Sequence, residues 1–502
     1  MLTFLKNEKV AKTVNLLKII FLCLFTFYIV SRDIIIMGIF AGNLFITAFF
    51  MGVSFLFIFY DLLTKRFCLK TRYFPAAVIF LLVTIISCII NYKYGIFSNL
   101  KGISTFIIYF FLLYPESFAD KKSTTLSCCM NTAFFSTAVY SALSIPMYFF
   151  NVFHYSIGEQ PQGYSPNSRR LWGLYQDPNY LALYTLLAIF ISVFLFATTK
   201  SIVKKIIYVI VDIIHLVILA MAGSRMGTVC FIAALFWISA VTCVSVLKQK
   251  LFVRIIIFIC AAALSVTIPF CSAQLINNSM PHLKKEVLHS ITAEEYVNVR
   301  KFYNSLYLGF RVQGGLEEPD KLIENFPFDQ QNSSLNRVDN DPQDISNGRI
   351  DRWIDGFKLL AEKPFFGISP RNIFSFADKS ESETLMGEND FNIHNTYIEI
   401  LAGAGIIGGL FVIVFLLFAA FFILKSVFKE TPSIKTIICS TEIVMITLAA
   451  ILLPDIIFFQ LTFAGLVFWL SLGYCLNTDE ENYKKSLTHK WLTKLLKRNP
   501  NI

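Results

Sequence analysis

Residues 401–424 read LAGAGIIGGLFVIVFLLFAAFFIL, an apolar block without a single charged side chain. At 1.5 Å per residue, a helix of about 20 such residues crosses the roughly 30 Å hydrocarbon layer of a membrane. Lipid offers no hydrogen-bonding partner to free backbone groups, so a crossing segment of this kind must be helical. This stretch therefore predicts a membrane-spanning helix.

Similar blocks recur along the whole chain. Of its 502 residues, 55% are apolar and 16% are charged, whereas a soluble domain has roughly 25% charged residues. The sequence therefore predicts an all-α integral membrane protein with about twelve spans. The expected spans cover residues 12–30, 34–60, 73–91, 102–115, 126–150, 176–197, 206–222, 226–246, 252–272, 397–424, 436–453 and 455–475.

These spans divide the chain into four regions. Residues 1–272 hold the first nine expected helices, and residues 397–475 hold the last three. Residues 273–396 between them form a long loop, and loops of this length are usually functional. Residues 476–502 form a basic tail. An amphipathic helix is expected near 348–362 because apolar residues recur there at helical spacing. They are Ile350, Trp353, Ile354, Phe357, Leu360 and Ala361.

The distribution of Lys and Arg predicts the orientation. With the N-terminus inside, the cytoplasmic segments hold 25 of these residues and the short outer loops hold six. Basic residues collect on the cytoplasmic side of membrane proteins, so both termini are expected in the cytoplasm and the long loop outside. The same rule explains the net charge of +10 without a nucleic-acid partner.

The eleven cysteines lie almost entirely inside the apolar blocks, and residues 273–396 contain none. This pattern does not form a disulfide framework, and it lacks a CxxC pair with metal-ligand spacing. We therefore expect no structural metal.

Arg225 follows the seventh expected span in the sequence AGSRMG, residues 222–227. A cation at this depth can simply extend to the membrane surface. Small neighbours also allow a bulky anionic headgroup to approach a fixed guanidinium, which is the functional interpretation.

Arg349 and Arg352 lie one turn apart at the start of the expected amphipathic helix. Arginines beside the backbone amides of a helix N-terminus suit a phosphate group. The alternative is that both side chains extend to lipid headgroups.

His394 precedes the tenth expected span in the sequence FNIHNTY, residues 391–397. Thr396 and Glu399 have the spacing of a capping box, which predicts that a helix begins there. An imidazole at a water–membrane boundary can act as a base or bind phosphate. A lone histidine is also commonly structural.

Two weaker features accompany these three sites. Arg169 and Arg170 precede an Asp-Pro-Asn turn at 177–179, which opens the sixth expected span. Asp212 and His215 share one side of the seventh span, where an interhelical hydrogen bond explains them as well as a proton relay does.

In this order, the motifs resemble the O-antigen ligase and polymerase superfamily of bacterial membrane glycosyltransferases. The most specific part covers about residues 345–412, and the first five spans contribute only helix number. The sequence departs from the pattern at Ile368-Ser369-Pro370, where a second glycine is commoner. The matching motifs are Asp177-Pro178-Asn179, Ser224-Arg225, Gly348-Arg349 with Trp353, KPFFG at 363–367, and HNTY at 394–397 before a glycine-rich span.

The resemblance implies a GT-C-like, metal-independent enzyme of the bacterial inner membrane that needs no cofactor. Its donor would be a glycan on undecaprenyl pyrophosphate, at the extracytoplasmic face. Arg225 and Arg349 would stabilise the leaving pyrophosphate, and His394 would orient or deprotonate the acceptor hydroxyl or contact the pyrophosphate. Arg352, Arg169, Arg170 and Asn395 are the expected substrate-binding residues.

The acceptor separates the functional alternatives. A polymerase adds the chain to another lipid-linked repeat unit, a ligase transfers it to a lipid core, and an oligosaccharyltransferase transfers it to protein. We favour a polymerase because no feature suggests a protein-acceptor groove. A transporter or flippase of the lipid-linked glycan is the rival class, but the two halves of the chain do not match. The expected partners are the donor, a glycan or lipid acceptor, membrane lipid, a chain-length regulator and a flippase.

Overall fold

The computed structural model describes residues 8–34, 43–64, 74–119, 123–155, 161–165, 170–175, 177–247, 250–307, 348–379, 392–428 and 432–477. Arg169, the tail after residue 477, and residues 308–347 and 380–391 of the long loop lie outside the described residues. Within the described ranges, nine helices are long and apolar enough to cross a membrane. Two shorter apolar helices accompany them, Pro75–Ile90 and Phe463–Leu476. The chain is therefore a helical multi-pass membrane protein, and the number of twelve spans stays a prediction.

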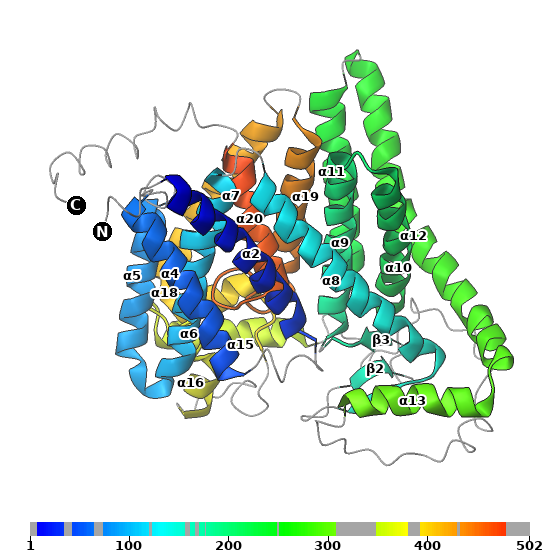
Figure 1. Cartoon of the computed structure of the whole chain (residues 1–502). Helices are drawn as coiled ribbons and strands as arrows, with labels where there is room; N and C mark the ends of the chain where they lie inside the picture. Colours follow the sequence, from blue (N-terminus) through cyan, green and yellow to red (C-terminus); the bar gives the residue numbers. More distant parts are fainter. Residues whose placement is uncertain are drawn as a thin grey trace.

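Most helices of the first group lie on one side of the molecule, and the last of them crosses towards the other side (Figure 1). Between Ile96 and Ala119 the helix is continuous through a π-helical turn, so it is longer than the expected span 102–115. A short 3₁₀ turn, η2, precedes it. The elements are α2 (Glu8–Arg32), α4 (Leu44–Thr64), α5 (Phe74–Ile90), η2 (Tyr92–Tyr94), α6 (Ile96–Ile108), η3 (Tyr109–Leu113), α7 (Tyr114–Ala119) and α8 (Thr124–Phe149).

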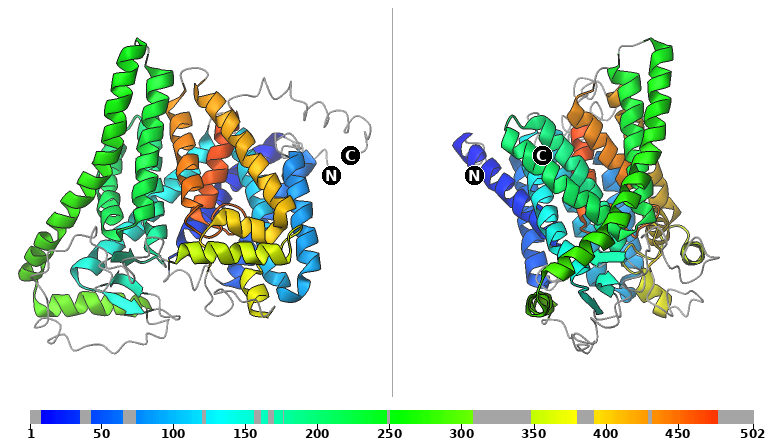
Figure 2. Two further views of the ribbon diagram at one scale, coloured as in Figure 1. Left: turned by 180° about the vertical axis from the view of Figure 1, so that it is seen from behind. Right: turned by 90° about the vertical axis from the view of Figure 1, so that its right-hand side faces the viewer.

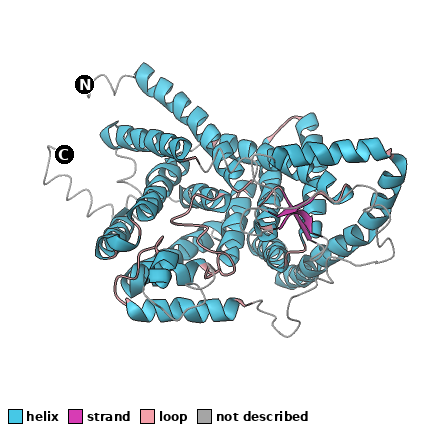
Figure 3. Ribbon diagram, turned by 90° about the horizontal axis from the view of Figure 1, so that it is seen from below, coloured by secondary structure: helices cyan, strands magenta, loops and turns pink. Residues whose placement is uncertain are grey.

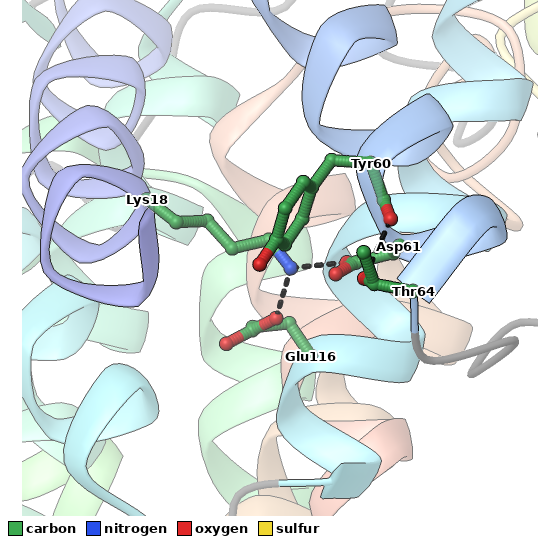
Figure 4. Close-up of polar contacts among 5 residues, drawn as sticks. All are labelled: Lys18, Tyr60, Asp61, Thr64 and Glu116. Carbon is green, nitrogen blue, oxygen red and sulfur yellow. Dashed lines mark hydrogen bonds and ion pairs between the residues drawn. The ribbon is translucent and has the colours of Figure 1, made fainter. Parts of the chain in front are cut away.

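A buried charge cluster connects three of these helices (Figure 4). Lys18 of α2 is 1% exposed and forms ion pairs with Asp61 of α4 and with Glu116 of α7, the latter at 2.5 Å. Removing one member of such a buried pair leaves an uncompensated charge, at a cost of about 3–5 kcal/mol. The cluster therefore constrains how α2, α4 and α7 pack.

The second group begins with α9, which buries most of its side chains. Helix α12 continues to Ser290, well past the expected end at residue 272, and its far part leaves the bundle towards α13 (Figures 1 and 2). The elements are α9 (Pro178–Thr198), α10 (Ile202–Ala222), α11 (Arg225–Val241), η4 (Thr242–Val246), α12 (Leu251–Ser290) and α13 (Ala293–Tyr307).

A small antiparallel sheet was not expected from the sequence. Its strands are β1 (Phe153–Tyr155), β2 (Pro161–Ser165) and β3 (Arg170–Gly173), in the order β1-β2-β3. Figure 3 shows it between the helices when the molecule is seen from below. Strand β3 leads directly into the turn before α9 and so fixes the start of that helix.

The last group carries the histidine motif. Helix α15 (Arg349–Glu362) lies across the lower end of the upright helices, with α16 (Ile373–Lys379) beside it (Figure 1). Helix α18 (Thr396–Phe428) bends at Gly405, which has φ 69°. A Cβ atom there would lie 2.2 Å from the carbonyl oxygen of Phe365, so only glycine fits. Helices α19 (Ile434–Ala449) and α20 (Phe463–Asn477) follow.

The expected span 455–475 is wrong in its first part. Residues 450–462 are turns and bends, most of them buried, and the helix begins only at Phe463. Irregular backbone inside a membrane protein needs protein partners. The Tyr109 hydroxyl contacts the carbonyls of Gln460 and Thr462 at 2.9 and 3.2 Å, and the Trp469 indole donates to Ile457 O at 2.7 Å. These contacts replace the missing helical hydrogen bonds.

Candidate active site

His394 stands in the turn before α18, with its backbone in the left-handed region at φ 54°. Few non-glycine residues adopt this conformation outside constrained sites. The helix begins at Thr396, as expected, but the prediction that Thr396 and Glu399 form a capping box is wrong. The side chain of Asn395 caps the helix instead, because its Oδ1 accepts from the amides of Tyr397 at 3.0 Å and Ile398 at 3.2 Å. Asn395 therefore caps the helix that follows His394, and its expected contact with substrate stays a prediction.

Thr396 and Glu399 hold the 450–462 segment. The Thr396 amide donates to Ala450 O at 2.8 Å, and its hydroxyl contacts Pro454 O at 3.0 Å. The carboxylate of Glu399 accepts from the amide of Asp455. The carboxylate of Asp455 in turn accepts from the amides of Phe458 and Phe459, at 2.9 and 2.6 Å. The start of α18 and this segment therefore form one connected unit.

Helix α15 brings two cations to His394. A Cβ on Gly356 would lie 2.6 Å from Ile398 Cγ2 and 3.2 Å from Ile393 Cδ1, so this glycine allows α15 to pack closely on the histidine turn. Burial, followed by the charges of Arg352 and Arg349, lowers the pKa of His394 from 6.5 to about 4. The imidazole is therefore neutral at pH 7 and faces a cationic surface.

Arg349 is the first residue of α15, and Arg352 follows one turn later. Burial, and secondly the charge of Arg349, lowers the pKa of Arg352 below its usual range, which shows that the two guanidiniums repel each other. An anion bound beside them would relieve this repulsion and the depressed pKa of His394 together. The arrangement suits a phosphate or pyrophosphate.

Arg225 is exposed and begins α11. Its neighbour Ser224 caps the helix by accepting from the amide of Gly227 at 3.1 Å. The Ser224 hydroxyl also donates to Asn179 Oδ1 at 2.8 Å, which joins the Ser-Arg motif to the Asp-Pro-Asn motif. The two motifs thus form a single structural unit that presents Arg225.

Arg170 supports this unit from β3. It is 6% exposed, and its Nε donates to Ala222 O at 2.8 Å. A second nitrogen contacts Asn179 Oδ1 at 3.3 Å. Arg170 therefore fixes the turn before Arg225, and its expected contact with substrate stays a prediction. Arg169 lies outside the described residues.

The structure thus brings together His394, Arg349 and Arg352 among the predicted residues. Arg225 is contributed by a different element, the start of α11. Among the described residues, no group of three His, Cys, Asp or Glu side chains has the arrangement of a metal site.

Asp33 was missed by the sequence analysis. It follows α2 directly, and its carboxylate accepts from the hydroxyl of Tyr184 in the buried α9. Burial raises the pKa of Asp33, and the charge of Arg32 partly offsets this effect. The signal was an acidic residue at the edge of an apolar block, which is costly unless it has a partner.

Asp212 and His215 take part in a contact between two helices, which is one of the two interpretations of these residues. Asp212 accepts a hydrogen bond from Ser192 of α9, and His215 is fully buried at 3.8 Å from its carboxylate. The ring of His215 packs edge-on against Phe134. This pair connects α9 and α10.

The fold and this site define a multi-pass helical membrane protein with an arginine–histidine site at one end of its bundle. Residues 210–413 match the family model described as O-Antigen ligase. The matched region runs from α10 into α18 and includes Arg225, Arg349, Arg352 and His394. The match covers part of the chain and supports the resemblance of its motifs to the O-antigen ligase/polymerase superfamily. No curated protein matches it.

Proposed function

We propose that this protein is a bacterial inner-membrane glycosyltransferase that uses a glycan on undecaprenyl pyrophosphate. The observation that carries the proposal is the neutral His394 beside Arg349 and Arg352. The distribution of basic residues supports an extracytoplasmic position for this site, because it assigns the segment between α12 and α18 to the outer face. The family match supports the reaction class.

The chemistry follows from the charges. The guanidiniums of Arg349 and Arg352 bind the donor pyrophosphate and stabilise the charge that grows as its bond to the anomeric carbon breaks. The acceptor hydroxyl forms the new bond to that carbon and gives its proton to the neutral imidazole of His394. Binding of the pyrophosphate raises the pKa of His394, which makes the imidazole a better base in the complex than in the free enzyme.

For the acceptor, we propose a second lipid-linked repeat unit, so that the reaction is polymerisation. Transfer to a lipid core is the second candidate, and the description of the matching family favours it. In either case the reaction at His394 is the same, and the acceptor alone differs.

A reconstituted reaction tests the proposal. Purified protein is incubated with an undecaprenyl-pyrophosphate-linked repeat unit, and the products are separated on a gel. His394→Ala is compared with His282→Ala, a matched control that removes an exposed histidine from α12. A ladder that only His394→Ala abolishes supports a polymerase.

Acceptors are then added one at a time. Transfer to a lipid core or to a protein acceptor, without a ladder, supports the ligase. If none of these substrates is converted, the glycosyltransferase proposal is wrong and a transporter becomes the better interpretation.

A further inference from the structure

A second group of cations comes from the end of α2, the start of α6 and the residue pair before α16, elements that reach the same end of the bundle as α15 (Figure 1). Arg32 ends α2, Lys101 lies in the first turns of α6, and Arg371 stands just before α16. The charges of Arg32 and Arg371 both act on the ammonium of Lys101. Three separate elements therefore bring three positive charges together.

Arg371 is held in this position by its surroundings. A Cβ on Gly102 would lie 2.8 Å from Arg371 Cγ, so the arginine stem lies directly on α6 where the glycine leaves room. The Arg371 amide donates to Asn99 Oδ1 at 3.2 Å, and its guanidinium contacts Gln460 Oε1 at 3.3 Å. The packing and these contacts direct Arg371 to the 450–462 segment.

Arg32 reaches the same segment, because its guanidinium donates to Leu461 O at 2.9 Å. The other end of the segment is bonded to Thr396, two residues after His394. The 450–462 segment therefore has the histidine site at one end and the second cation group at the other.

Carboxylates act on this group at a distance but do not form ion pairs with it: Asp33 is influenced by Arg32, and Asp455 and Glu399 by Arg371. Within the described residues, Arg32, Lys101 and Arg371 form no ion pair, and the Lys101 ammonium makes no hydrogen bond. These carboxylates make their hydrogen bonds elsewhere: Asp33 with Tyr184, Asp455 with backbone amides, and Glu399 with the amide of Asp455. Like charges held together without a paired carboxylate favour an anionic ligand, and guanidinium groups match the geometry of phosphate.

We propose that Arg32, Lys101 and Arg371 bind the phosphate-bearing headgroup of the acceptor lipid. The inference rests on the proposed function, in which the first cation group holds the donor. It explains why a transferase would need two cationic groups, since donor and acceptor are both anionic lipids. The acceptor is either a second lipid-linked repeat unit or a phosphorylated lipid core, and both carry the required phosphate.

Binding of labelled lipids in neutral nanodiscs tests the proposal. Arg349→Gln is used as the background, because it disables the donor site and leaves the acceptor site. Into it we introduce Lys101→Gln or Arg371→Gln, each of which should weaken acceptor binding about tenfold, the effect of losing one charged contact. Lys93→Gln is the matched control, because it removes an exposed cation near α6 that lies over the ring of Tyr94.

Gly102→Ala provides a test without a change of charge. Its added methyl group displaces the stem of Arg371, so we expect weaker acceptor binding with full protein abundance. The lipid that remains bound in the Arg349→Gln background identifies the acceptor, with a repeat unit indicating a polymerase and a phosphorylated core indicating a ligase.

Two outcomes overturn the inference. The first is that neither lipid binds to the Arg349→Gln variant. The second is that Lys101→Gln and Arg371→Gln weaken binding no more than Lys93→Gln does. Failure of the proposed function looks different: Arg349→Gln then binds the repeat unit as tightly as wild type does, and wild type shows no transfer.

Discussion

The pH dependence of glycan transfer tests the environment of His394 directly. Burial and two arginines lower its pKa to about 4, so the free enzyme keeps a neutral imidazole far into the acid range. At pH 5.5 a group with pKa 4 is about 97% neutral, whereas an ordinary histidine of pKa 6.5 is only about 9% neutral. If His394 is the base, kcat/KM should therefore be nearly unchanged between pH 7 and 5.5 and fall only near pH 4.

The Arg352→Gln variant tests in which direction the neighbouring charge shifts the pKa of His394. The variant removes a positive charge that lowers the pKa of His394, so the acid limb of kcat/KM should move to higher pH. Lys358→Gln is the control, since it removes a cation from the same helix that pairs with Asp355 at 2.9 Å. A wild-type acid limb near pH 6.5, or equal profiles for the two variants, would refute the assignment of His394 as the base in a cationic environment.

Three further predictions concern the arginine sites and the backbone. Arg349→Ala should abolish transfer while membrane insertion and abundance stay unchanged, because its partner is a substrate anion; a reconstituted assay beside quantitative blotting decides this. Asn179→Leu removes the acceptor shared by the turn before Arg225, so thermal unfolding should show a loss of about 1–3 kcal/mol and transfer should fall, while unchanged values would contradict the support role. Gly405→Ala should strongly reduce abundance because of the clash with the backbone, whereas Gly52→Ala, with no atom within 4 Å, should be tolerated; equal abundance would refute the glycine argument.

The sequence predicted the membrane helices because hydropathy and length decide whether a segment can cross lipid. The same measure failed at residues 450–462, which are mostly apolar although they also contain Pro454, Asp455 and Gln460. Hydropathy reports burial and carries no information on backbone conformation. The irregular path depends on distant partners such as Tyr109 and Trp469, which no local pattern identifies.

Part of the candidate site could also be predicted from the sequence. Charge type and position next to a helix start singled out Arg349, Arg352 and His394, and the structure brings these three together. The support role of Arg170 could not be read from the sequence, because two arginines before a span look alike whether they face a substrate or a helix end. Only the packing of β3 against the end of α10 shows that Arg170 binds Ala222 O.

The 450–462 segment also explains why a membrane glycosyltransferase would keep irregular backbone in its interior. A straight helix directs its backbone groups along its own axis and cannot bond laterally to neighbouring elements. This segment instead bonds to α18 through Thr396 and Glu399, and to Arg32 through Leu461 O. Its own amides are fixed by Asp455. A rigid connection of this kind sets the separation between the two cationic groups, so that donor and acceptor would meet at a fixed geometry without a cost of reorganisation during the reaction.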